Sequence, residues 1–117
     1  MTESELYQKH LKSFFKQRGI FCYRVEHRRL PDVYLSRGNY VLWAELKCVN
    51  KKSKIVKPDW RPGQLAWIKE NHFHGSFNVC LILWYVDKIL YLPPQKEYTQ
   101  EELKCQKNIY LKTMLLM

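Results

Sequence analysis

The chain has 117 residues, 46% of them hydrophobic, with 20 Lys and Arg against 11 Asp and Glu and a formal net charge of +9 at pH 7. This length predicts a single domain, and the hydrophobic share excludes a disordered basic tail. The surplus of positive charge favours a polyanionic partner, either nucleic acid or an anionic membrane surface.

The hydrophobic runs and the cysteines narrow the class further. The longest hydrophobic run, residues 79–86, is far shorter than the roughly 20 residues of a membrane-spanning helix, so we expect no membrane span. The acidic first residues are unlike a secretory signal, and we expect a cytoplasmic protein. The cysteines form no C-x-x-C pair, which argues against structural zinc and favours free thiols in a reducing compartment; they are Cys22, Cys48, Cys80 and Cys105.

The first expected element is a helix over residues 3–18. Thr2 and Glu5 have the spacing of a capping box, hydrophobic residues recur at intervals of three and four, and Gly19 suits the helix end. On a regular helix Glu3 falls on the same stripe as Tyr7, whereas Glu5 points nearly the opposite way. An acid on the core-facing stripe is unusual, and its simplest explanation is a favourable interaction with the helix dipole.

Strands are expected over residues 20–25, 32–35 and 40–49, with a tight turn at residues 36–39. Residues 47–61 contain six basic residues and one acid, with Pro58 as a breaker, and predict a loop or an extended basic arm. A short helix is expected over residues 63–71. The segment over residues 77–86 is mostly hydrophobic without alternation, which is typical of a strand covered on both faces, and it is the expected centre of the sheet.

The remaining elements are a tight reversal at Asp87-Lys88, a strand over residues 89–92 and a last helix over residues 99–112. Thr99 and Glu102 repeat the spacing of a capping box at the start of that helix. The order α-β-β-β-α-β-β-α predicts an α/β (α+β) fold with a central mixed sheet flanked by helices. We expect residues 1–94 to form the core and residues 95–117 a C-terminal helical extension of the same domain.

The residues that suggest chemistry are Asp32, Glu45 and Lys47. Glu45 and Lys47 are two apart on a strand and share a face. With a two- or four-residue hairpin loop, Asp32 pairs with Trp43 or with Glu45 and lies on that face, whereas a three-residue loop would place it on the other. Two close carboxylates repel unless a cation lies between them, and hard oxygen ligands suit Mg²⁺. We therefore predict a metal site, with Lys47 positioning a water or stabilising charge at phosphorus. The alternative is a cross-strand salt bridge of Lys47 with either acid.

The motif Pro31-Asp32, followed thirteen positions on by Glu45-Leu46-Lys47 within this order of elements, resembles the PD-(D/E)XK nuclease superfamily. The likeness covers about residues 3–92 and is greatest to the VRR-NUC and archaeal Holliday-junction-resolvase branches. It implies a restriction-endonuclease-like core that hydrolyses DNA phosphodiesters with Mg²⁺, for which Mn²⁺ substitutes. It also implies a homodimer that acts on branched DNA.

The resemblance further implies residue roles. Asp32, Glu45 and the Leu46 carbonyl would hold the metal, Lys47 would orient the attacking water, and Glu3 would join directly or through water. Glu5 can be aligned in place of Glu3, and only the helix-face argument favours Glu3. The segment Arg61-Pro62-Gly63-Gln64 is similar to the start of a Gln-bearing helix in these branches, so that Gln64 is a candidate for positioning substrate or water rather than an exposed first-turn residue.

Basic and aromatic residues nearby are expected to contact DNA. Trp60, and less so Tyr34 and Trp43, are candidates for base stacking, whereas His72 and His74 lack a third metal ligand. A non-catalytic nucleic-acid-binding module and an RNA-binding domain are the rival interpretations, although the aromatic and glycine signatures of common RNA modules are missing. The basic residues expected to contact phosphates are Arg24, Arg28, Arg29, Lys51, Lys52, Lys54, Lys57 and Arg61.

Overall fold

The computed structural model describes residues 1–26, 30–73, 78–105 and 109–117, without the side chains of residues 71–73, 105, 109 and 110. Within these ranges the helices and strands follow the predicted order, with additions in the basic arm and near the C-terminus. The elements are α1 (Glu3–Leu6), the π-helical turn η1 (Tyr7–Leu11), α2 (Lys12–Gln17), β1 (Phe21–Arg24), β2 (Val33–Arg37), β3 (Tyr40–Val49), β4 (Ile55–Val56), α3 (Gln64–Phe73), β5 (Val79–Tyr85), β6 (Lys88–Leu92), β7 (Tyr98–Thr99), α4 (Gln100–Cys105) and α5 (Ile109–Leu116).

Five strands form the central sheet in the order β1-β2-β3-β5-β6. β3 and β5 are parallel, whereas the other neighbouring pairs are antiparallel. The predicted mixed sheet flanked by helices is confirmed. The expectation that residues 77–86 form the sheet centre is wrong, because β3 is the middle strand; β5 lies between β3 and β6 and is nevertheless almost wholly buried.

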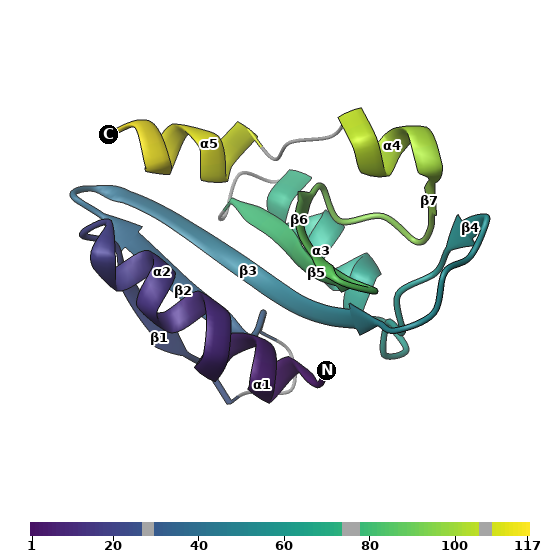
Figure 1. Ribbon diagram of the computed structural model, residues 1–117. Coiled ribbons are helices and arrows are strands. Elements are labelled where there is room, and N and C mark those ends of the chain that lie inside the picture. The colour runs from purple at the N-terminus through teal and green to yellow at the C-terminus, as the bar shows by residue number, and fades with distance from the viewer. Residues whose placement is uncertain (27–29, 74–77, 106–108) are drawn as a thin grey trace.

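Helices lie on both faces of the sheet (Figure 1). The α1–η1–α2 run and α5 lie on the nearer face, and α3 lies behind the sheet. Leu42, Ala44 and Leu46 of β3 point to the nearer face, where they join one hydrophobic core with the N-terminal helix and α5. Side chains alternate along a strand, so Glu45 points to the opposite face, where Gln64 of α3 contacts it.

The N-terminal helix contains a π-helical turn that the periodicity did not predict. The Lys12 N–H donates to the carbonyl of Tyr7, one residue further back than in an α-helix. This extra residue delays the phase of all later side chains by about 100°. Phe15 is therefore fully buried in the place that Phe14 would take on a regular helix, and Phe14 is only partly buried. Glu3 precedes the π turn, so its predicted alignment with Tyr7 is unaffected.

The basic arm is not merely a loop, since β4 within it pairs antiparallel with β7. Tyr98 of β7 and Leu103 of α4 pack on a second hydrophobic core over β5 and β6. Of the last helix expected over residues 99–112, the structure describes two helical segments, α4 and α5, and residues 106–108 between them lie outside the described residues. α4 begins after the predicted Thr99 cap, which is confirmed, and α5 continues to Leu116 because it buries Met114 in the first core.

The hairpin between β5 and β6 turns one residue earlier than expected, at Val86-Asp87, with Val86 at φ +60°.

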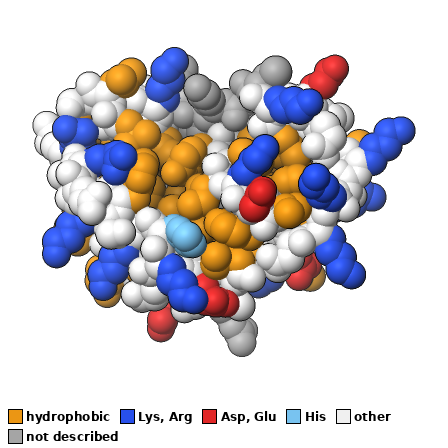
Figure 2. Space-filling view, in the orientation of Figure 1, with side chains coloured by type: hydrophobic (Ala, Val, Ile, Leu, Met, Phe, Trp, Pro, Cys, Tyr) orange, Lys and Arg blue, Asp and Glu red, His pale blue; other side chains and the backbone are white. Residues whose placement is uncertain are grey.

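On the nearer face, hydrophobic side chains gather between the helices, with Lys and Arg around the rim (Figure 2). Among the described residues, no helix has the length and hydrophobicity needed to cross a membrane.

Candidate metal centre

The hairpin of β2 and β3 brings Asp32 opposite Glu45. The ladder pairs Val33 with Ala44 and closes through a two-residue turn in which Gly38 has φ +58°, a value that glycine adopts without strain. The next pair in this register is Asp32 with Glu45, which confirms one predicted register and excludes the one with Trp43. The carboxylate of Asp32 accepts the backbone N–H of Leu46 through Oδ2 at 3.0 Å, and this bond fixes its position across the end of β2.

The Leu46 backbone is available at the same place. Its N–H points toward Asp32, and on a strand the carbonyl of a residue points to the same side as its N–H. Pro31 stands where the register would place a partner for Leu46, and proline has no N–H to donate. The β2–β3 ladder therefore cannot use the Leu46 carbonyl at this position, and that oxygen points to the side of β3 on which Asp32 lies.

The carboxyl of Glu45 is 1% exposed and forms a hydrogen bond with that of Asp32. Burial first, and then the hydrogen bond and the charge of Asp32, raise the pKa of Glu45 to about 9, against the opposing charges of Lys47 and Arg61. The raised pKa favours the protonated form of Glu45 at neutral pH in the metal-free protein. Because a divalent cation can replace that proton and satisfy both carboxylates, this oxygen donor set fits Mg²⁺.

Lys47 and Gln64 complete a buried polar network beside the acids. The Lys47 side chain is 6% exposed, and its Nζ donates to the Asp59 carbonyl at 2.8 Å and to Oε1 of Gln64 at 3.2 Å. The Nε2 of Gln64 donates to Oε2 of Glu45 at 2.6 Å. Gln64 is 7% exposed, so the alternative of an exposed first-turn residue is wrong. Among the described residues Lys47 forms no salt bridge with either acid, because its bonds go to neutral oxygens.

The start of α3 is built to hold Gln64 in this orientation. Gly63 has φ +78°, a left-handed conformation that turns the chain sharply into the helix. The Gln64 Oε1 also accepts the Arg61 N–H at 3.1 Å. Trp60 donates through Nε1 to the Gln95 carbonyl, and its ring lies 5.3 Å from the Nζ of Lys47. The ring of Trp60, a candidate for base stacking, is therefore already in contact with the ammonium group.

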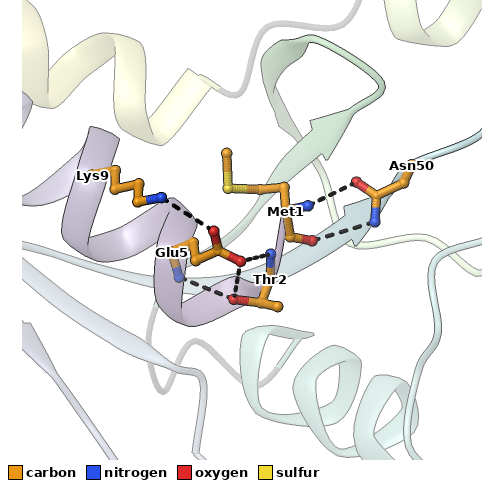
Figure 3. A network of polar contacts seen from close by, with 5 residues as sticks. All are labelled: Met1, Thr2, Glu5, Lys9 and Asn50. Atoms are coloured by element: carbon orange, nitrogen blue, oxygen red, sulfur yellow. Dashed lines mark hydrogen bonds and ion pairs between the residues drawn. The ribbon is translucent and has the colours of Figure 1, made fainter.

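The N-terminal network separates Glu3 from Glu5 (Figure 3). Glu5 accepts the backbone N–H of Thr2 as the second half of the predicted capping box, which is confirmed, and it pairs with Lys9 at 3.3 Å. The amino group of Met1 donates to Oδ1 of Asn50 at 3.4 Å, and the Nδ2 of Asn50 donates to the Met1 carbonyl. These bonds tie the helix start to the end of β3, and Glu3 lines the same hollow as Asp32 and Glu45.

A hollow of about 410 Å³ joins these elements. Six residues predicted for the site line it, and sequence reasoning missed Thr2, Ser4 and Asp59. Asp59 was visible as the one acid of the basic arm, whereas nothing marked Thr2 or Ser4. Within the described ranges, no three acidic, His or Cys side chains are close enough to hold an ion together, so Glu3 stands further off than the Asp32–Glu45 pair. The predicted residues that line the hollow are Glu3, Arg24, Asp32, Glu45, Lys47 and Arg61.

The four lysines among the other predicted phosphate contacts do not line this hollow. Lys52 and Lys54 line a separate hollow near the β5–β6 turn, of about 450 Å³. Lys51 is exposed, and Lys57 is exposed and lies 3.9 Å from Glu97. Arg28, Arg29 and His74, and the side chain of His72, lie outside the described residues.

Comparison with known proteins finds a similar fold among solved structures. No protein-family model matches the sequence, and no curated protein does. Among solved structures, Hjc of Archaeoglobus fulgidus, a Holliday junction resolvase from an archaeal hyperthermophile, superposes with a TM-score of 0.68 over 91% of this chain and 96% of that one. The two folds are alike. The identity is 12%, so the likeness shows the fold and leaves the chemistry to the site itself.

Proposed function

We propose that the protein is a Mg²⁺-dependent endonuclease that hydrolyses DNA phosphodiesters. The observation that carries the proposal is the geometry of the site, in which buried Glu45 lies opposite Asp32 and Lys47 is held beside them by Gln64. A cross-strand salt bridge would explain none of these features, since Lys47 bonds to neutral oxygens. The likeness of the fold to an archaeal Holliday junction resolvase supports the same reaction class.

The residues of the site would have different roles in metal binding and in catalysis. Asp32, Glu45 and the Leu46 carbonyl would hold the ion, with Glu3 reaching it through water. A bound Mg²⁺ supplies Lewis-acid stabilisation of charge at the scissile phosphate, and Mn²⁺ would substitute for it. The ammonium of Lys47 has three N–H groups, of which two bond to Asp59 and Gln64. The third can orient the attacking water or donate to a phosphate oxygen.

Charge and symmetry extend the proposal to the substrate. Arg24 and Arg61 line the hollow and would bind the phosphates on either side of the cut, with the remaining predicted basic residues contacting more distant phosphates. We include a homodimer, because a two-fold branched substrate favours a two-fold enzyme. Affiliation with the VRR-NUC branch in particular stays a prediction, as does the boundary at residue 94.

A cleavage panel tests the proposal. Junction, flap, duplex and single-stranded DNA are incubated with Mg²⁺ or with EDTA, using the wild-type protein, Lys47→Ala and the matched control Lys112→Ala. Lys112 is exposed on α5, does not line the hollow and is not among the predicted phosphate contacts. We expect cleavage with Mg²⁺ only, a rate loss of roughly 100-fold or more for Lys47→Ala with binding retained, and little change for Lys112→Ala. DNA binding without cleavage by the wild type would leave a non-catalytic binding module.

A further inference from the structure

The face of the sheet that carries the acids also carries a row of aromatic residues, here called the aromatic strip: Phe21, Tyr23, Tyr34 and Trp43. Phe21 is 58% exposed and Tyr23 is 61% exposed, although both lie within β1. Tyr34 and Trp43 are partly buried. Exposed hydrophobic side chains that lie next to one another on a folded domain mark interaction sites, whereas scattered single ones do not.

Strand register places the strip directly beside the metal centre. Tyr23 is opposite Tyr34, and Tyr34 is opposite Trp43, so the three side chains form one row across β1, β2 and β3. The next row on the same face is Asp32 with Glu45, two residues further along each strand. Two residues of a strand span roughly 7 Å. A ligand whose reacting group lies at the acids therefore extends over the strip if it runs along β2 and β3 toward the hairpin turn.

The rings of the strip support one another. Phe21 meets Tyr34 edge-on with centroids 6.1 Å apart, and Tyr34 meets Trp43 edge-on at 5.3 Å. This edge-to-face packing holds the inner rings in place. The exposed ring of Tyr23 lies on β1 directly opposite Tyr34, which contacts both Phe21 and Trp43. The strip therefore offers a supported aromatic surface at the edge strand of the sheet.

The area and the charge of this face decide what could occupy it. An aromatic side chain buries roughly 150–250 Å², so two rings just over half exposed offer far less than the roughly 800 Å² per partner that a stable protein interface needs. The chain carries a net charge of +9, and Arg24 and Arg61 line the hollow at the end of the strip. A polyanion with flat, hydrophobic faces fits both properties, and single-stranded nucleic acid is such a ligand.

We propose that the aromatic strip, with Tyr23 at its exposed edge, stacks on unpaired bases of the strand whose phosphate lies in the hollow. This inference rests on the proposed nuclease function and specifies its substrate as DNA with unpaired nucleotides beside the cut, such as a flap or an opened branch point. Bases within a continuous duplex are stacked on one another and do not present their faces. The strip would therefore select for unpaired DNA, whereas the basic residues hold any backbone.

The test measures affinity in EDTA, so that it does not depend on cleavage. The probes are a fluorescent duplex and the same duplex with a single-stranded flap, and the variants are Tyr23→Ala, Tyr23→Phe and Phe21→Ala. Leu116→Ala is the matched control, because Leu116 is 78% exposed at the end of α5. We expect Tyr23→Ala to weaken flap binding roughly fivefold or more and duplex binding by less than about twofold. Tyr23→Phe should retain wild-type affinity because it keeps the ring.

Three results would overturn the inference. The first is an equal loss for both probes, and the second is no loss for the flap with either Tyr23→Ala or Phe21→Ala. The third is a fall in molecular mass in solution on Tyr23→Ala, because the strip would then contact a second copy of the chain. If the wild type fails to cleave any DNA with Mg²⁺ while the selective loss is observed, the nuclease proposal fails and the stacking surface stands.

Discussion

Replacing Gln64 with Leu tests whether the polar network around the acids is as interdependent as its geometry indicates. The substitution removes the donor to Glu45 at 2.6 Å and the acceptor for Lys47 at 3.2 Å, in a side chain that is only 7% exposed. Each buried partner left unsatisfied costs about 1–3 kcal/mol, and the added hydrophobic burial returns part of this. We expect the metal-free protein to lose roughly 2–4 kcal/mol of unfolding free energy.

Urea denaturation in EDTA, followed by tryptophan fluorescence, measures this loss. The control is Gln95→Leu, which removes an amide that donates to Glu102 at 2.7 Å, outside the hollow. We also expect Gln64→Leu to reduce Mg²⁺-dependent cleavage by roughly 10- to 100-fold, as for other residues that orient metal ligands. A loss no greater than that of Gln95→Leu would refute the idea that Gln64 couples Glu45 to Lys47.

Three further predictions follow from the same geometry. The native pKa of Glu45, about 9, lies above its unfolded value of 4.5, so protonation of Glu45 stabilises the metal-free fold fully below pH 4.5, and this stabilisation is lost as pH rises through 9. The melting temperature of Glu45→Gln in EDTA should therefore rise relative to that of the wild type between pH 5 and pH 9. A constant difference between the two melting temperatures would contradict the shift. Glu3→Ala should lower the cleavage rate with little change in melting temperature, whereas Glu5→Ala should do the reverse, because Glu5 caps the helix and Glu3 lines the hollow; equal effects in both assays would remove the distinction. Gly63→Ala should cost about 1–2 kcal/mol, measured by urea denaturation, because φ is +78° there while the space around it is open; an unchanged stability would mean that α3 can start without the left-handed turn.

The fold was predictable where local pattern and tertiary contacts agree. The hairpin of β2 and β3 has turn residues that restrict its register, and both capping boxes are written in the sequence as Thr2 with Glu5 and Thr99 with Glu102. The π turn was not predictable, because it depends on packing Phe15 rather than Phe14 against the sheet. The pairing of β4 with β7 was missed for a similar reason: two-residue strands from distant segments carry almost no periodicity.

The site was predictable to the extent that strand geometry determines it. Asp32, Glu45 and Lys47 follow from the face rule and the register, and the hydrogen bonds of Gln64 agree with its predicted importance. What the sequence could not supply was the path of the basic arm, which brings the Asp59 carbonyl to Lys47 and takes Lys52 and Lys54 to another hollow. These placements depend on long-range contacts of irregular backbone, for which sequence spacing gives no rule.

The most direct test of the central claim is a calorimetric titration of the DNA-free protein with Mn²⁺ at pH 6 and pH 8, comparing the wild type with Asp32→Asn. The wild type should bind the ion with release of a proton, and more tightly at pH 8, because the ion replaces the proton that Glu45 holds. Asp32→Asn should lose most of this affinity. Equal Mn²⁺ binding by the two proteins would contradict the claim that the Asp32–Glu45 pair is the metal centre.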